Sequence, residues 1–383
     1  MKAHIVRDTL FFCASVCIGS TPIHAQVVTL TENQSPSDIV VVAPSIEVDS
    51  VETNREHALP SEHALPSDSE IPSDSELPGV ACNERPCKSF SSSCGPTWTA
   101  TADGLFLNRS TPADNLLLFN VGAPSQNLNA SSFNFASRTG ADLTLTRHLG
   151  ACDSLEVRYF GIDQWDSSNS FLTTPGSSIQ FNFATPGFAD SGTPVNSRYG
   201  SELQNAELNL RRRYNDWLTL LTGFRYLELD ETLSINVPSV PFPIDLRVDS
   251  RNRLYGGQVG ADAKLFDRGG PLTVSALGKA GIYGNAAAQN GLISNTFISF
   301  PANANASQTS FVGELGFTGT YRWSNNLSLR GGYRMLWIDG VALATDQLAT
   351  TSFLPPGFGP PTTVAANGDV FYHGAFSGLQ YAW

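Results

Sequence analysis

The stretch "FYHGAFSGLQYAW" (residues 371–383) ends the chain and alternates large apolar side chains with small or polar ones. Leu379, Tyr381 and Trp383 share one parity, and Gln380 belongs to the other. Successive side chains of a β-strand point to opposite faces. Because chain ends are usually poorly ordered unless something holds them, this pattern predicts a terminal strand that is paired within a sheet and has one apolar face.

The same alternation recurs from residue 97 to the C-terminus, and each apolar face carries almost no charge. In "NAELNLRRR" (205–213), for example, Ala206, Leu208 and Leu210 alternate with polar residues. A transmembrane β-barrel alternates lipid-facing apolar and lumen-facing polar side chains over about 10 residues per strand. A sheet with one wet face also alternates, so a secreted soluble β-sandwich is the alternative.

Connection lengths favour the barrel. We predict about ten strands, or up to twelve if the alternating segments 178–183 and 295–300 extend hairpins. The ten are 97–109, 138–149, 155–165, 199–213, 217–230, 251–265, 272–285, 310–322, 327–338 and 370–383. Short turns then alternate with long loops at 110–137, 166–198, 231–250, 286–309 and 339–369. Outer-membrane barrels have this layout, so the sequence predicts an all-β fold, a closed antiparallel transmembrane β-barrel.

The six tryptophans all fall at predicted strand ends. Indole rings favour the boundary between hydrocarbon and headgroups, and barrels carry aromatic girdles at both boundaries. The residues predicted to form these girdles are Trp98, Trp323 and Trp383 on the short-turn side, and Trp165 and Trp337 on the long-loop side.

Two different segments precede the barrel pattern. Residues 1–25 are typical of a secretory signal, with Lys2 and Arg7 before a short apolar stretch. Residues 26–96 form an acidic Pro/Ser-rich tail that includes the repeat "EHALPSEHALPSDSEIPSDSELP". Proline at every sixth position interrupts helices and sheets, and the polar composition predicts a disordered spacer. The predicted barrel occupies 97–383.

The charge of the chain argues against nucleic-acid binding. Twelve acids against three bases give residues 26–94 a charge of −9, out of −12 for the whole chain. No basic patch that would bind nucleic acid occurs in the sequence. No segment after the signal reaches the roughly 20 unbroken apolar residues of a transmembrane helix.

Four cysteines follow the signal: Cys82, Cys87, Cys94 and Cys152. An even number in an exported chain indicates disulfides, and four cysteines allow three pairings. A zinc site is the alternative, but the spacing lacks paired C-x-x-C knuckles. We predict the pairs Cys94–Cys152 and Cys82–Cys87.

The predicted pairing follows from the strand order. Cys94 lies three residues before the first strand, and Cys152 lies in the short turn after the second. Both reach the same rim, where their Cα atoms can come within the 4.4–6.8 Å of a disulfide. We expect non-reducing peptide mapping to recover a peptide joining Cys94 to Cys152. A dominant peptide joining Cys87 to Cys94 would refute this arrangement.

Charged residues on the inward parity are the candidate lumen residues. They are Glu207, Arg211, Arg225, Asp262, Lys264, Lys279, Glu314, Arg330 and Arg334. In a pore they would tune ion selectivity, whereas in a plugged barrel they would pair with one another. Eight strands are filled by side chains and sixteen to eighteen leave a channel, so ten lie near the filled limit. A narrow or plugged structural or binding barrel and a small-solute or ion pore both remain open.

Two lumen pairs are expected across short hairpins, Glu207–Arg225 and Glu314–Arg334. Counting back from each turn makes the two members of a pair diagonal neighbours, with Glu207 opposite Gly223. Diagonal neighbours are within reach of long side chains, so each carboxylate should pair with its guanidinium.

The sequence offers little support for an enzyme. It contains no G-x-S-x-G elbow, H-E-x-x-H motif or phosphate loop. His148 and His373 lie in the barrel region, and Ser377 follows His373 by four residues, which span about 13 Å along a strand. That distance exceeds hydrogen-bond reach. We expect no catalytic, cofactor-binding or metal-binding residue and no cofactor, with a barrel-embedded lipid-modifying enzyme as the alternative.

Several segments spread over 97–383 resemble the putative β-barrel porins of planctomycete bacteria. The matching stretches include "WTATADGLFLNRS", "LEVRYFGIDQW", "SELQNAELNLRRR", "GFRYLELDE", "NRLYGGQVGAD", "LRGGYRMLWIDGVALATDQL" and "YHGAFSGLQYAW". The resemblance implies a barrel surrounded by outer-membrane lipid and assigns no substrate or site residue. It also implies that the barrel assembly machinery reads the terminal strand ending at Trp383. An even strand number returns both chain ends to the short-turn side, so the tail is expected in the periplasm.

Overall fold

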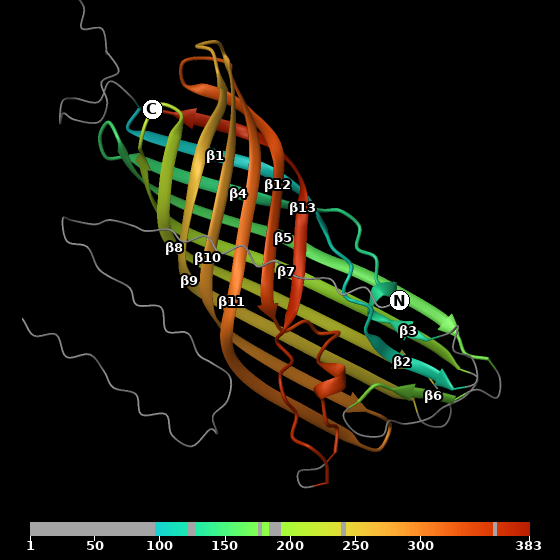
Figure 1. Cartoon of the computed structure of the whole chain (residues 1–383). Coiled ribbons are helices and arrows are strands. Elements are labelled where there is room, and N and C mark those ends of the chain that lie inside the picture. The colour runs from blue at the N-terminus through green and yellow to red at the C-terminus, as the bar shows by residue number, and fades with distance from the viewer. Residues whose placement is uncertain (1–95, 122–126, 175–177, 184–192, 239–242, 355–357) are drawn as a thin grey trace, which may run out of the picture. The chain divides into compact units, whose positions relative to one another are not determined.

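The computed structural model contains an antiparallel β-barrel that closes on itself (Figure 1). It describes residues 96–121, 127–174, 178–183, 193–238, 243–354 and 358–383. The predicted signal, nearly all of the predicted tail, and Cys82, Cys87 and Cys94 lie outside the described residues. Cys152 is described and is disulfide-bonded.

Ten strands of the described chain form the barrel, and all neighbouring pairs are antiparallel. They are β1 (Trp98–Arg109), β4 (Arg138–His148), β5 (Asp153–Leu172), β7 (Pro194–Arg213), β8 (Leu218–Val237), β9 (Ile244–Asp267), β10 (Leu272–Ser294), β11 (Ser299–Arg322), β12 (Leu327–Val341) and β13 (Gly368–Ala382). The prediction of a closed ten-stranded antiparallel barrel is confirmed.

The last strand closes the ring by pairing with the first. β13 runs antiparallel to β1 from the pair Thr99–Ala382 to the pair Arg109–Tyr372. The backbone N–H groups of Thr97 and Trp98 both donate to the carbonyl of Trp383, at 2.7 and 2.9 Å. The C-terminal residue is therefore held by the sheet, as the alternation in 371–383 predicts.

Several strands are much longer than predicted. β8 and β9 are joined by 238–243 and β10 and β11 by 295–298, so the long loops predicted at 231–250 and 286–309 are wrong. These segments continue the alternation, but here the apolar residues lie on the inner face of the barrel. Leu233, Ile235 and Val237 point inward and are buried. The strands continue beyond the part of the barrel that carries lipid-facing apolar residues.

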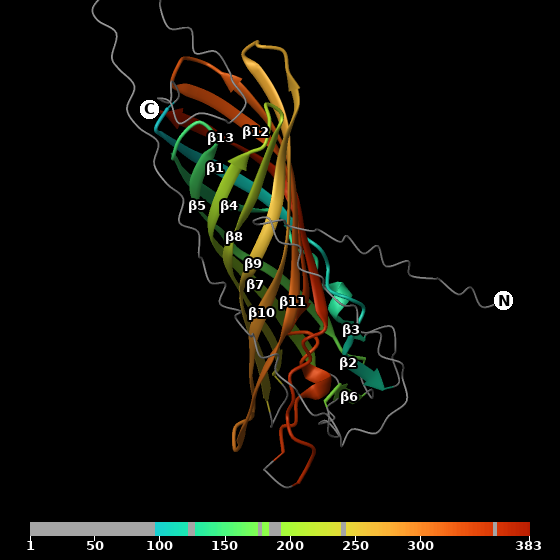
Figure 2. The same cartoon turned by 60° about the vertical axis from the view of Figure 1, so that its left-hand side comes forward.

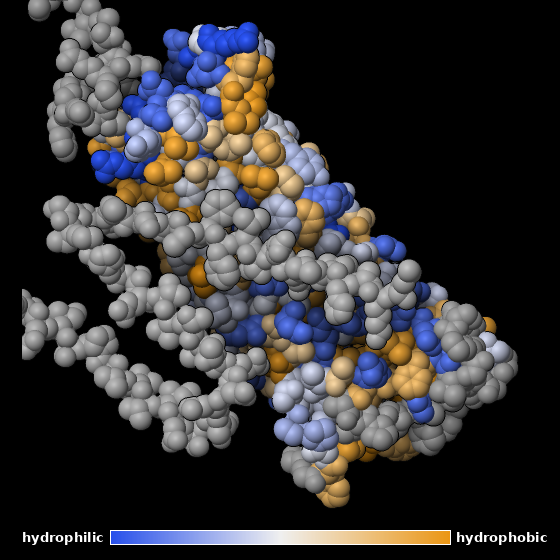
Figure 3. Space-filling view, viewed as in Figure 1, coloured by the Kyte–Doolittle hydropathy of each residue, from blue (hydrophilic) through white to orange (hydrophobic). Residues whose placement is uncertain are grey.

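The outer surface of the barrel divides into two zones. Near the short turns, exposed apolar side chains form a band on the outward parity, including Leu143, Val157, Leu208, Phe224 and Phe317. Figure 3 shows apolar side chains below the hydrophilic tips of the short turns at the top of the view.

Beyond this band the outward parity becomes polar. Cross-strand ion pairs join Arg198 to Asp166 and Arg251 to Asp230, each at 2.9 Å. A hydrocarbon environment suits the first zone and water suits the second, so the longer strands form an extension outside the bilayer.

A small sheet and the β12–β13 connection line the inside of this extension. β2 (Leu116–Val121) lies between β3 (Leu128–Asn129) and β6 (Ser178–Phe181), apart from the barrel ring (Figure 2). The segment 178–183 thus belongs to this sheet and does not extend a barrel hairpin. The sheet, the β12–β13 connection and the inner faces of β7–β11 share one apolar core. No helix of the described residues is long and apolar enough to cross a membrane.

The predicted aromatic girdle is partly wrong, because Trp165 lies inside the barrel. Its side chain is fully buried and contacts Tyr372, with ring centroids 5.0 Å apart. A bulge in β5 between Ile162 and Trp165 reverses the parity of the strand beyond it. Trp98 and Trp383 stack at the short-turn rim, with ring centroids 6.5 Å apart. The other girdle residues, Trp323 and Trp337, are exposed.

Candidate functional site

The lumen within the apolar band is crossed by charged side chains from nine of the ten strands. In the described lumen these are six acids (Asp103, Asp142, Glu156, Glu207, Asp262, Glu314) and six bases (Arg158, Arg211, Arg225, Lys279, Arg330, Arg334). Their formal charges cancel, six against six. These charges lie in the lumen because side chains alternate between the two faces of each strand. Where lipid covers the outside, polar residues are placed on the inner face.

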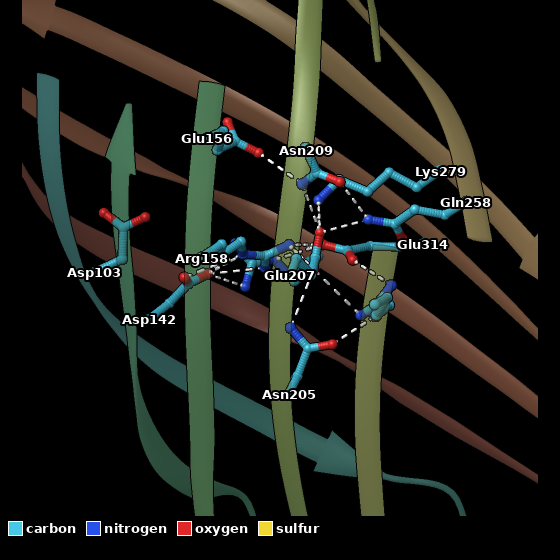
Figure 4. Close-up of polar contacts among 12 residues, drawn as sticks. Asp103, Asp142, Glu156, Arg158, Asn205, Glu207, Asn209, Gln258, Lys279 and Glu314 are labelled. Carbon is cyan, nitrogen blue, oxygen red and sulfur yellow. Dashed lines mark hydrogen bonds and ion pairs between the residues drawn. The ribbon is translucent and has the colours of Figure 1, made fainter. Parts of the chain in front are cut away.

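Arg158 of β5 lies at the centre of this ionic cluster (Figure 4). Its guanidinium nitrogens lie 2.9 Å from Asp142, 3.1 Å from Glu207 and 2.8 Å from Glu314. The side chain is only 4% exposed. One buried cation therefore compensates carboxylates from β4, β7 and β11, and it ties opposite walls of the barrel together.

Three further bases complete the centre of the cluster. Lys279 Nζ lies 2.7 Å from Glu207, and Arg225 Nη1 lies 3.1 Å from Glu314. Arg334 donates to Asp142. Each central carboxylate thus contacts at least two cations, and each of these bases contacts at least one acid. This pairing is the condition under which charges can be buried at all.

The two pairs expected from the sequence are present. Arg225 lies 3.7 Å from Glu207 and Arg334 lies 3.6 Å from Glu314. The pair Glu314–Arg334 is diagonal, as predicted. Glu207, however, lies directly opposite Arg225 and not opposite Gly223, because the β7–β8 hairpin pairs two residues further along than the count from its turn implies.

Neutral amides satisfy the remaining hydrogen-bonding capacity of Glu207. Its two oxygens accept hydrogen bonds from Asn205, Asn209 and Gln258, at 3.1, 3.0 and 2.8 Å. Asn209 also donates to Glu156 at 3.0 Å. These contacts add hydrogen bonds to charged groups, which are stronger than neutral ones, and they fix the rotamers of the cluster.

Lys264 does not join the ionic cluster, although it was predicted to line the lumen. It lies at the rim of the short-turn end, 47% exposed, with its ammonium 3.5 Å from Asp267. Lys264 pairs directly with Ser275 and so keeps the parity of Asp262, but it lies two residues nearer the short-turn end, where its side chain reaches solvent.

Four charged members of the cluster were absent from the predicted set: Asp103, Asp142, Glu156 and Arg158. A signal for them is in the sequence, because Glu156 and Arg158 alternate with Leu155 and Val157, and Asp103 alternates with Ala102. The parity of Asp142, between Ala141 and Leu143, carries the same information. Alternation therefore finds charged lumen residues wherever no bulge intervenes.

A polar cavity of about 400 Å³ separates the ionic cluster from the short-turn end. Arg211, Asp262 and Arg330 lie in its wall, together with several threonines. His148 lines it as well, with Nε2 3.0 Å from the hydroxyl of Thr99. In the described residues, no group of three or more His, Cys, Asp or Glu side chains is arranged to hold a metal ion.

On the other side of the ionic cluster an apolar layer fills the lumen. On β5, β8 and β12 the inward residue next to a cluster member is apolar, with Phe160 after Arg158, Leu227 after Arg225 and Leu336 after Arg334. The side chains of Phe160, Leu227 and Leu336 are at most 1% exposed, and all three belong to one core cluster. Protein interiors packed in this way leave few voids larger than a water molecule.

One buried ion pair crosses the barrel beyond the apolar layer. Arg109 of β1 contacts Glu231 of β8 at 2.5 Å, and the hydroxyl of Tyr199 donates to the same carboxylate. Burial, together with the carboxylate, raises the pKa of the Tyr199 phenol well above its usual range. Glu231 also accepts a hydrogen bond from the backbone N–H of Ala344, at 3.0 Å, and so anchors the β12–β13 connection inside the barrel.

A closed ten-stranded barrel with an apolar outer band, a charged lumen and a polar extension defines an outer-membrane β-barrel protein. Residues 173–383, more than half of the chain, match the family described as putative beta barrel porin-7. The chain belongs to this family. No curated protein matches the sequence.

Solved structures of outer-membrane barrels are similar to this chain. The outer membrane protease OmpT from Escherichia coli shares 10% identity, with a TM-score of 0.44, covering 77% of this chain and 100% of that one. The translocator domain of the autotransporter NalP from Neisseria meningitidis shares 9%, with a TM-score of 0.35 and coverage of 75% and 89%. The anion-selective porin from Comamonas acidovorans shares 11%, with a TM-score of 0.17 and coverage of 75% and 100%.

Proposed function

We propose that this protein is a closed, non-conducting barrel that anchors the folded extension at its long-loop end to the outer membrane. The observation that carries the proposal is the filling of the lumen by two successive layers, the ionic cluster around Arg158 and the apolar layer that includes Phe160 and Leu227. A conducting pore needs a continuous polar path, and the apolar layer interrupts it.

The β12–β13 connection supports the closed state. The carbonyl of Ala342 accepts hydrogen bonds from Ser250 at 2.5 Å and from Asn252 at 2.8 Å. The amide of Asn252 also accepts from the backbone N–H of Ala342, at 2.7 Å. Removing this connection from the lumen would take away the acceptor of the Ser250 hydroxyl and of the Asn252 amide N–H, and an unpaired buried group costs about 1–3 kcal/mol. The connection is therefore a fixed part of the inner core.

A planar-bilayer recording tests the proposal. We expect the full chain, once inserted, to give no unitary current steps, because no continuous water path crosses the two layers. Heat-shifted gel mobility of the reconstituted sample verifies that the barrel is folded, and a known porin inserted into the same bilayer verifies that steps are detectable. Reproducible steps that scale with salt concentration would favour the ion-pore reading and refute the closed barrel.

We also propose that the barrel carries no catalytic site. In support, His148 contacts Thr99 inside the lumen, whereas His373 faces outward and its Nδ1 lies 2.6 Å from the hydroxyl of Tyr333. The two rings thus lie on opposite faces of the sheet, where a shared substrate could not reach both.

The short-turn end is proposed to face the periplasm and the extension to face the outside. Bacterial outer-membrane barrels have short periplasmic turns and longer external loops. The first residue of β1 and the last residue of β13 both lie on the short-turn side (Figure 1). The tail that precedes β1 would then lie in the periplasm.

A further inference from the structure

An apolar groove lies on the lipid-facing side of the barrel, centred on β1 and extending over β4 and β5 on one side and β13 and β12 on the other. It has a volume of about 520 Å³ and is lined almost entirely by apolar side chains. Its floor is Ala100 and Ala102, and the directly paired residues on both sides are large. Leu145 and Tyr381 flank Ala100, and Leu143 and Leu379 flank Ala102.

The outward residues of β1 on either side of the groove floor differ. Toward the short-turn rim the next one is Trp98, which pairs directly with Arg147 on β4. In the other direction the next one is Gly104, whose direct neighbours Ala141 and Ser377 are also small. A row of small residues therefore leads from the groove toward the middle of the membrane, and an aromatic ring and a cation follow on the rim side.

A cation lies on the rim side of the groove floor, beside Trp98. The guanidinium of Arg147 stacks over the ring of Trp98, 5.4 Å from its centroid, and Trp98 in turn stacks on Trp383. Arg147 follows Leu143 and Leu145 on the outward parity of β4 and is exposed. An arginine held by an aromatic ring presents its planar donors to a phosphate, and this one lies at the height of the indole belt, where headgroups lie.

We propose that this groove is a phospholipid site, in which one acyl chain lies on Ala100, Ala102 and Gly104 and the lipid phosphate is bound by Arg147. The row of small residues along β1 supports an acyl chain, because the five residues from Ala100 to Gly104 rise about 13 Å. The position of the cation supports a phosphate, because the charge lies at the end where the groove meets the interface. A second barrel is the competing occupant, and it would need no charge at that end.

Native mass spectrometry tests the site, with the full chain reconstituted with palmitoyl-oleoyl phosphatidylglycerol and released from detergent. We expect the unmodified barrel to retain one lipid. Ala102→Leu fills the floor and should lower the retained fraction about tenfold, a loss of the size of one good contact. Arg147→Gln should lower it roughly fivefold, as expected for one basic contact at a membrane surface.

Two matched variants control for general effects. Ala280→Leu makes the same exchange on the outward face of β10, between Val259 and Gly313. Arg268→Gln removes another rim arginine that stacks on an aromatic, 5.2 Å from the centroid of Phe266. Both should retain the lipid as the unmodified chain does, and heat-shifted mobility should show that all four variants fold.

Three outcomes would overturn the proposal. The first is that the unmodified barrel retains no lipid. The second is that Ala102→Leu and Ala280→Leu lose it equally, which would indicate bulk lipid with no defined site. The third is a dimer that Ala102→Leu abolishes, which would make a second barrel the occupant of the groove.

Discussion

Replacing Arg158 by methionine is expected to lower the free energy of unfolding by about 3–5 kcal/mol, the range measured when one partner of a buried ion pair is removed. Arg158 contacts Asp142, Glu207 and Glu314 at 3.1 Å or less, and its side chain is only 4% exposed. Methionine fills a similar volume but leaves these almost fully buried carboxylates with fewer cations. The measurement is equilibrium urea unfolding of the barrel in lipid vesicles, followed by tryptophan fluorescence.

A matched control separates the buried cluster from arginine pairing in general. Arg198 pairs with Asp166 at 2.9 Å, but its side chain is 67% exposed and lies on the polar outer surface. Exposed pairs contribute about 0–1 kcal/mol, so Arg198→Met should be nearly neutral. Equal effects of the two substitutions would show that the lumen is hydrated and that the ionic cluster is not a plug.

Combining Arg158→Met with Asp142→Asn tests the cause of the loss. The double variant removes one base and one acid, and Arg334 keeps Glu314 at 3.6 Å as a partner. If uncompensated charge is responsible, the double variant should recover part of the stability, because replacing a buried ionic group by neutral residues is often tolerated. If it is no more stable than Arg158→Met alone, uncompensated charge does not explain the loss.

The sequence predicts the barrel well because lipid and lumen impose opposite requirements on adjacent residues. Leu208 faces lipid and Glu207 faces the lumen, so alternation alone places both. The ten strands, the closing pair of β1 and β13 and the ion pairs to Glu207 and Glu314 follow from it.

The failures have local causes. The bulge before Trp165 reverses the parity of β5 without any mark in the residue pattern. Lys264 keeps its parity but lies at the short-turn rim, away from the ionic cluster. The sequence predicts loops in place of the strand extensions because the apolar residues change faces there. In segments such as 231–237, outside the bilayer, they point into the barrel, whereas within the bilayer they point outward. The central position of Arg158 in the lumen depends on three strands that meet across the barrel, and parity along one strand carries no such information.

Leu208→Arg should lower the free energy of unfolding by about 2–4 kcal/mol, the measured range for arginine facing lipid near the bilayer midplane. Leu208 lies on the outward parity of β7, 48% exposed, directly opposite Phe224. An arginine there must hold its charge in hydrocarbon or bend its side chain toward the interface. Urea unfolding in vesicles measures the loss, and heat-shifted gel mobility shows whether the variant folds at all.

Gln204 is the matched control, because it lies on the same strand and the same face, four residues further toward the long-loop end. The side chain of Gln204 is exposed and hydrogen-bonds Glu202 at 2.9 Å, which places it in the polar zone beyond the apolar band. Arginine near the interface costs only about 0–1 kcal/mol, so Gln204→Arg should be close to neutral. A large loss at both positions would move the membrane boundary into the extension, and a small loss at both would mean that β7 does not face lipid. The contrast between the two positions therefore locates the edge of the bilayer on β7 to within about 13 Å, the rise of four strand residues.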